Sequence, residues 1–263
     1  MNILKLLESF DLGEQTNSGK TISRQESFSL LGSFGKKVAF AAIPATMLAT
    51  MSKKSFAVTN DIPGVLNFAL TLEYLERNYY TMAIAAGVIP AGDLAVFQQI
   101  KKHEVAHVDF LITAINSVGA TPTAEPEFDF TAGGAFNPFS VYADFLALSQ
   151  AFEDTGVRAY KGQAGNLISN NDVLTAALAI HSVEARHASE VRRIRSEKGW
   201  ITGNSRGTLP APTQPVYDGE ENVMQGGVDA TTVTTVGAPA VQEAFDEPLT
   251  DTQVMAIASL FLA

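Results

Sequence analysis

Two segments, HEVAHVDFL at residues 103–111 and VEARH at residues 183–187, each place a histidine three residues after a glutamate. The pairs are Glu104 with His107 and Glu184 with His187. In an α-helix, residues three apart lie on one face, so each pair can direct a carboxylate and an imidazole at one point. Both pairs fall on apolar helical stripes, where a polar side chain is costly to bury without a partner. The two segments therefore predict two helices that supply ligands to a buried metal site.

The same arrangement recurs 80 residues further along the chain. A glutamate lies 31 residues before each pair, at Glu73 and Glu153, and a tyrosine follows each of these glutamates by seven residues, at Tyr80 and Tyr160. One glutamate from each of two helices, together with a Glu-x-x-His pair from each of two others, is the ligand pattern of dinuclear carboxylate bundles. The predicted metal ligands are therefore Glu73, Glu104, His107, Glu153, Glu184 and His187.

The spacing of apolar residues predicts four long helices, over residues 62–86, 91–118, 139–169 and 171–198. The first and last joints between them are short, whereas residues 120–138 are rich in Pro, Gly, Thr and Phe and show no helical period. Two antiparallel hairpins joined by a long crossover is the connectivity of a ferritin-like bundle. We therefore predict an all-α fold built on a four-helix bundle.

The chain outside this bundle has a different composition. We predict a leader at residues 1–57, the bundle at 58–200, and an extended, loop-rich tail at 201–263. The tail is expected to end in a short helix that begins after Thr250 and lies against the bundle as a fifth helix.

The leader has the features of a signal peptide. Residues 38–51 are apolar or small and lie between two Lys-Lys pairs, and Ser55-Phe56-Ala57 offers small residues for cleavage. The segment Ser23–Phe28 is similar to a degraded twin-arginine motif. These features predict export to the periplasm or the cell exterior. The alternative is a cytoplasmic protein whose N-terminal segment forms an amphipathic helix packed on the bundle.

The composition excludes several classes of protein and site. Eighteen basic residues against 28 acidic ones, a formal charge of −10, argue against a nucleic-acid binder, which needs a field of Lys and Arg. The absence of cysteine removes disulfides, thiolate zinc sites and Fe–S clusters, so a metal must be held by oxygen and imidazole. No apolar run reaches the length of about 20 residues that spans a bilayer as a helix, so no stable membrane span is expected.

Residues 62–200 resemble the ferritin-like superfamily, and within it the bacterial ferritin-like domain proteins akin to desiccation-related proteins. The resemblance is carried by Leu66–Glu76, His103–Leu111, Glu184–His187 and Phe245–Thr250. It implies that the six residues predicted above are metal ligands. The resemblance implies a metal site but no particular reaction, because the activity of these proteins is poorly defined.

Some neighbours of the ligands are candidates for supporting them. Glu76, one turn after Glu73, is expected to be solvated or supporting, because its counterpart in the repeat is Gly156. His181, one turn before Glu184, is a supporting residue, an extra ligand or a core histidine. His103 is rotated by about 100° from Glu104 on the helix and is expected outside the site. Tyr80 and Tyr160 have three alternative roles. They donate hydrogen bonds to ligand carboxylates, pass electrons or simply pack in the core.

Four carboxylates and two imidazoles suit two Fe or Mn ions better than zinc, which prefers four-coordinate sites richer in His or Cys. The predicted function is a dinuclear metal protein that handles O₂ or H₂O₂, as a ferroxidase, an oxidase or a peroxide scavenger, including a protein similar to manganese catalase. The alternative is a non-enzymatic stress-protection or envelope protein with a structural or vestigial site. Storage in a closed ferritin cage is less favoured, because the tail could obstruct packing. The low surface charge weakly favours a homo-oligomer.

Overall fold

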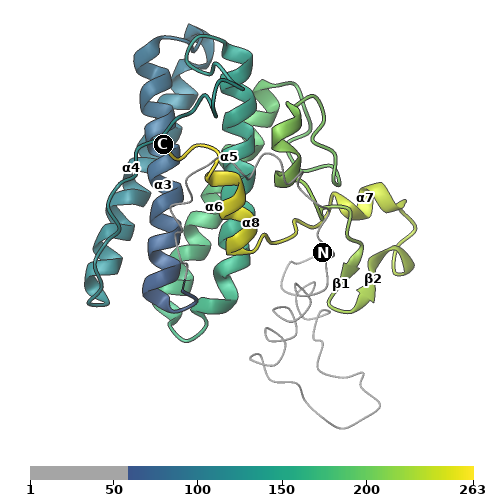
Figure 1. Cartoon of the computed structure of the whole chain (residues 1–263). Coiled ribbons are helices and arrows are strands. Elements are labelled where there is room, and N and C mark those ends of the chain that lie inside the picture. Colours follow the sequence, from purple (N-terminus) through teal and green to yellow (C-terminus); the bar gives the residue numbers. More distant parts are fainter. Residues whose placement is uncertain (1–58) are drawn as a thin grey trace. The chain divides into compact units, whose positions relative to one another are not determined.

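The computed structural model describes residues 59–263, in which four long helices form the main body. Helices α3 and α4 form one hairpin, and α5 and α6 form a second; within each hairpin the two helices pack along their length (Figure 1). The long crossover leads from α4 to α5. The predicted all-α bundle of two hairpins is confirmed, whereas the predicted leader and its signal peptide lie outside the described residues. The four helices are α3 (Ile62–Ala86), α4 (Ala91–Ser117), α5 (Tyr142–Gln163) and α6 (Asn171–Ile194).

The ends of these helices follow from local sequence. The side chain of Asp61 accepts a hydrogen bond from the backbone N–H of Gly64, which caps the start of α3, and Pro63 occupies the first turn. Gly87 ends the helix with a φ of 68°, a conformation that glycine adopts without strain. The side chain of Asn170 caps the start of α6 in the same way as Asp61 caps α3.

Two helices are shorter than their predicted ranges. α5 begins at Tyr142, and a 3₁₀ turn at Ala164–Leu167 (η1) replaces its expected last turns. α6 ends at Ile194, because Ser196 has a φ of 62° and cannot continue a right-handed helix. In both cases the apolar spacing of the sequence extends beyond the residues that form α-helical backbone hydrogen bonds.

The core is built around α5. Every residue from Phe145 to Tyr160 is buried, so this helix is covered on all sides. At the end of the bundle where α5 begins, aromatic rings fill the interior: Phe97 lies 4.7 Å from Phe145 and 6.0 Å from Tyr80 between ring centroids. This end is therefore closely packed.

The tail is made of short elements and one C-terminal helix. These are η2 (Ala211–Val216), β1 (Met224–Gln225), β2 (Val228–Asp229), η3 (Ala230–Thr232), α7 (Ala238–Gln242) and α8 (Asp251–Ala258). The strands β1 and β2 pair in antiparallel orientation. Thr250 and Gln253 form a capping box at the start of α8, which packs against α5. The short C-terminal helix predicted after Thr250 is thus present and contacts the bundle.

A single buried arginine joins the tail to the bundle. Arg158 of α5, 1% exposed, forms an ion pair with Glu220 at 2.7 Å. Its guanidinium also donates to the backbone carbonyls of Glu247 at 2.8 Å, of Asp218 at 3.0 Å, and of Val216. One side chain of the bundle therefore contacts four residues from two parts of the tail.

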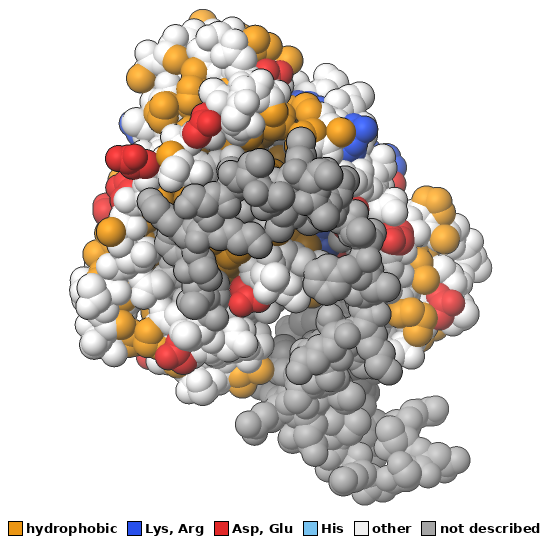
Figure 2. Space-filling view, in the orientation of Figure 1, with side chains coloured by type: hydrophobic (Ala, Val, Ile, Leu, Met, Phe, Trp, Pro, Cys, Tyr) orange, Lys and Arg blue, Asp and Glu red, His pale blue; other side chains and the backbone are white. Residues whose placement is uncertain are grey.

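No helix among residues 59–263 has the length and hydropathy needed to cross a membrane. Acidic and basic side chains are scattered over the part of the surface in Figure 2 that the described residues form.

Candidate metal centre

The structure brings all six predicted ligands together in the interior of the bundle, with each helix contributing to the cluster. The four glutamate side chains are 0% exposed, and the two histidines are 9% and 4% exposed. The donor atoms form two overlapping groups, within each of which all atoms lie within 4.8 Å of one another. The groups are Glu73, Glu104, His107 and Glu184, and Glu104, Glu153, Glu184 and His187.

The first group converges on the Nδ1 atom of His107. This nitrogen lies 3.2 Å from Glu73 Oε2, 3.1 Å from Glu104 Oε2 and 3.1 Å from Glu184 Oε1. A neutral imidazole carries at most one N–H, which cannot donate well to three carboxylates at once. The geometry is that of four donor atoms facing a common point.

The second group repeats this arrangement around His187. Its Nδ1 atom lies 3.0 Å from Glu104 Oε1, 3.2 Å from Glu153 Oε2 and 3.4 Å from Glu184 Oε2. Glu104 and Glu184 therefore present one oxygen to each histidine, whereas Glu73 and Glu153 each serve one group. Two carboxylates shared between two groups is the arrangement of bridging ligands.

Several of these oxygens have no hydrogen-bond partner within the described part of the chain. They are Glu104 Oε1 and both carboxylate oxygens of Glu184, which the imidazoles approach without the angle of a hydrogen bond. A buried carboxylate without partners is strongly disfavoured. The cluster is therefore compatible with a metal site, in which a cation would satisfy these atoms.

The electrostatics of the cluster depend on burial and on mutual contact. Burial by itself would lower the pKa of His107, but the neighbouring carboxylates outweigh it and raise the pKa to about 12. Burial by itself would also lower the pKa of His187, but the carboxylates around it outweigh burial and raise this pKa. Burial raises the pKa of Glu153 to about 7, whereas the two imidazoles beside Glu184 overcome burial and lower its pKa to about 2. Without metal, the carboxylates thus hold protons on the imidazoles.

The two tyrosines of the repeat each support a ligand from the opposite hairpin. Tyr160 on α5 donates to Glu73 Oε1 on α3 at 2.5 Å, and Tyr80 on α3 donates to Glu153 Oε1 on α5 at 2.5 Å. Of the roles considered from the sequence, hydrogen bonding to a ligand carboxylate is the one that the structure shows. Each bond fixes one oxygen and leaves the other directed at a histidine.

Glu76 is buried, not solvated. Its side chain is 3% exposed, and a Cβ added to Gly156 would lie 3.3 Å from Glu76 Oε1. The glycine at the equivalent position of the second hairpin thus leaves room for this carboxylate. Burial, and then the charges of Glu184 and the other cluster glutamates, raise the pKa of Glu76 well above its ordinary value. The expectation of a solvated residue is wrong; a supporting role stays a prediction.

His103 lies beside the cluster, although its helical angle predicted a position outside it. Its Nδ1 atom is 2.8 Å from Nε2 of His187, and the two rings stack with centroids 5.1 Å apart. Its own Nε2 is 2.7 Å from Gln99 Nε2. His103 belongs to neither donor group, as predicted, but it contacts the outer edge of His187 because α4 and α6 are neighbours.

His181 is not part of either donor group. It is half-buried and lies against the backbone of Val157, and burial lowers its pKa. Of the roles considered from the sequence, that of a core histidine fits this position best.

A comparison with protein families identifies the family to which the bundle belongs. A family model described as a ferritin-like domain matches residues 61–197, which is more than half of the chain. A search of curated proteins returned no match. The narrower resemblance to desiccation-related proteins stays a prediction. The matched range contains all four long helices and all six residues of the cluster, and the chain belongs to the ferritin-like domain family.

Proposed function

We propose that the cluster binds two divalent Fe or Mn ions and that the protein handles O₂ or H₂O₂. Glu104 and Glu184 would bridge the two ions, with Glu73 and His107 completing one side and Glu153 and His187 the other. The observation that carries this proposal is that each histidine Nδ1 faces three carboxylate oxygens, and that two carboxylates give one oxygen to each histidine.

The spacing of the donor atoms suits ions of this size. The distances from each Nδ1 to its carboxylate oxygens are 3.0 to 3.4 Å. Donors at right angles around an ion at about 2.1 Å are about 3 Å apart, as in octahedral coordination. The donor set fits the same conclusion, because oxygen-rich sites with imidazole favour Fe and Mn, and zinc favours fewer and softer ligands.

Charge balance supports two ions. Four buried carboxylates carry a formal charge of −4, which two divalent cations neutralise. In the metal-free protein the two imidazolium groups compensate only part of it. Since uncompensated buried charge is costly, a pair of cations stabilises this cluster more fully than protons on the histidines do.

A bound pair of Fe or Mn ions supplies the electrons for chemistry with O₂ or H₂O₂. The chain supplies the surroundings. Tyr80 and Tyr160 orient Glu153 and Glu73, the closely packed aromatic end excludes water from one side, and His103 holds the outer edge of His187. The carboxyl of Glu76, whose pKa is raised, keeps a proton close to the cluster.

The proposal is tested by metal content and oxidant consumption of the full chain, purified without chelator and loaded anaerobically with Fe²⁺ or Mn²⁺. We expect about two ions per chain and consumption of O₂ or H₂O₂. Glu104→Gln should lose metal and consumption together. Asp109→Asn, an exposed position on the same helix, should retain both.

Two results would contradict the proposal in different ways. Full metal content in Glu104→Gln would show that the ions bind elsewhere. Two ions per chain without consumption of either oxidant would favour the alternative, in which metals only stabilise the bundle.

A further inference from the structure

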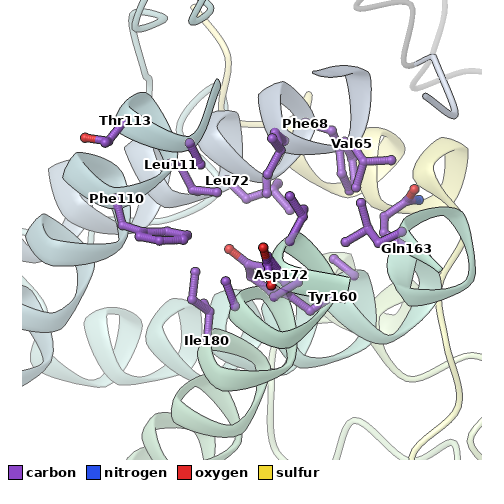
Figure 3. A pocket seen from close by; sticks show the side chains of 18 of the residues that line it. Val65, Phe68, Leu72, Phe110, Leu111, Thr113, Tyr160, Gln163, Asp172 and Ile180 are labelled. Carbon is purple, nitrogen blue, oxygen red and sulfur yellow. The ribbon is translucent and has the colours of Figure 1, made fainter. Parts of the chain in front are cut away.

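A pocket of about 300 Å³ lies at the end of the bundle opposite the aromatic cluster. It is formed by the first turns of α3, the last turns of α4, the end of α5 and the start of α6. In Figure 3, Phe110 and Leu111 of α4 lie on one side of the pocket and Ile180 of α6 lies on the other. Phe110 is 44% exposed at the rim, which is unusual for a large apolar ring.

The sequence repeat explains why this end is hollow. The ring of Tyr80 packs at the filled end against Phe97 and Phe145. The residues 80 positions away from these two phenylalanines are Ala177 and Val65, and both line the pocket beside Tyr160.

A third pair follows the same pattern. The counterpart of Tyr79, whose ring packs on Phe145 at 5.4 Å, is Ala159, and Ala159 also lines the pocket. Three aromatic rings of the filled end thus have small or aliphatic counterparts at the pocket end. The pocket thus lies where three positions carry small or aliphatic side chains and their counterparts at the filled end carry rings.

The inner wall of the pocket adjoins the metal centre. Tyr160 lines it, and the hydroxyl of Tyr160 donates to Glu73. Leu111 follows His107 by one helical turn, and Ile180 precedes Glu184 by one turn, so the wall lies one turn from the cluster on two helices. A molecule that fills the pocket would reach the side of the cluster that the aromatic end leaves open.

The chemistry of the lining selects the kind of molecule. Most of the 19 lining residues are apolar. The polar ones are Tyr160 and the buried Gln163 inside, and the exposed Thr113, Ser117 and Asp172 at the rim. Among the described residues no Lys or Arg lines the pocket, so the carboxylate of a fatty acid would meet Asp172 without a cation from them to balance it. A hydroxyl group could instead donate to the oxygens of the rim.

We propose that this pocket is a binding site for an uncharged aliphatic molecule, such as a medium-chain alcohol, with its apolar end toward Tyr160. A methylene group and a water molecule occupy similar volumes, about 30 Å³, so the pocket holds a chain of about ten carbons. Burial of apolar surface on both the chain and the pocket provides the driving force. The site does not depend on which metal the cluster binds.

The test is isothermal titration calorimetry of the full chain with 1-decanol, in metal-free and metal-loaded form. Ala177→Phe restores the ring found at the equivalent position of the filled end and should weaken binding at least ten-fold. Val65→Phe fills the same pocket from α3 and should act alike, so that one misfolded variant does not decide the result. Ala179→Phe, exposed on the same helix two residues from Ala177, should bind 1-decanol as the wild type does.

Binding of 1-decanol by both forms of the wild type, lost in the two filling variants while their metal content is unchanged, is the expected result. Absence of binding in the full chain would overturn the proposal, and so would unchanged binding in both filling variants. Tighter binding of decanoate than of 1-decanol would overturn the assignment to an uncharged ligand. A failure of metal binding would leave the titration of the metal-free form unaffected, so the two proposals are tested separately.

Discussion

At the scale of single residues, the hydroxyl of Tyr160 matters because it holds one oxygen of Glu73 while the other faces His107. Tyr160→Phe removes the donor and leaves a buried carboxylate oxygen unpaired. Groups that orient metal ligands typically change metal affinity by about 10- to 100-fold when removed. We expect a loss of about ten-fold in the affinity for the ion on the His107 side, measured by titration against a competing chelator.

The matched control for this change is Tyr142→Phe. Tyr142 also donates to a carboxylate, Asp93 at 2.6 Å, but away from the cluster. This variant should lose some stability and keep its metal affinity. An equal loss of affinity in both variants would mean that Tyr160 acts through general stability and not through Glu73.

Protonation of the metal-free cluster gives a second expected outcome. The pKa of His107 is raised to about 12 and that of His187 is also raised, so both imidazoles carry protons at pH 8. Metal ligation requires the neutral imidazole, so binding must release these protons. Glu153, with a pKa of about 7, adds a further proton at pH 6. Because protons compete with metal for the same atoms, affinity should rise as the pH rises.

Calorimetry in buffers with different ionisation enthalpies measures the number of protons released. At least two protons per pair of ions are expected at pH 8, and more at pH 6. Release of fewer than one proton at pH 8 would show that the imidazoles are neutral in the metal-free protein.

The sequence identified the six clustered residues because their spacing is repeated and both halves fall on apolar stripes. It did not predict His103 beside His187, since an angle on one helix says nothing about which helix lies next to it. For Glu76 it left a solvated and a supporting position open, and it did not show that the absence of a side chain at Gly156 leaves room for this carboxylate. The face of its own helix on which a residue lies was predictable from the sequence. The residues that it contacts on other helices were not, because they depend on how the helices pack.

At the scale of elements, α5 has the longest stretch buried on all sides, from Phe145 to Tyr160. The sequence predicted a helix at this position and a tail helix against the bundle, but it did not show that the tail packs on this helix. The covering is close: the backbone carbonyl of Leu249 would lie 1.9 Å from a Cβ added to Gly162, and Leu249 N–H donates to Arg158 O at 3.1 Å. The backbone of the tail thus packs directly against Gly162 of α5.

Gly162→Ala should force the segment before α8 away from α5. Overpacking of this kind typically costs about 1–3 kcal/mol, which lowers the melting temperature of a domain of this size by about 5 °C. Gly165→Ala is the control, because nothing lies within 4 Å of its added Cβ. Thermal unfolding of the two variants checks this, and equal melting temperatures would contradict the close contact at Gly162.

At the scale of the whole molecule, Arg158 determines whether the tail and the bundle unfold together. Its guanidinium satisfies Glu220 and the backbone carbonyls of three residues from two parts of the tail. Burial raises the pKa of Glu220 to about 7, although the charge of Arg158 and a hydrogen bond from the Glu247 backbone N–H both oppose this. Removing one partner of a buried ion pair typically costs about 3–5 kcal/mol.

Arg158→Leu should therefore release the tail while the helical hairpins, whose cluster it does not touch, keep their metal. We expect a melting temperature lower by about 10 °C and rapid proteolysis within residues 201–249, with a fragment that contains α3 to α6 surviving. Arg186→Leu, at an exposed position of α6, should change neither. A tail that resists protease in Arg158→Leu would mean that α8 and the contact at Gly162 hold it without the arginine. Loss of metal together with the tail would instead mean that the tail is needed to form the centre, because α8 packs against α5, the helix that carries Glu153.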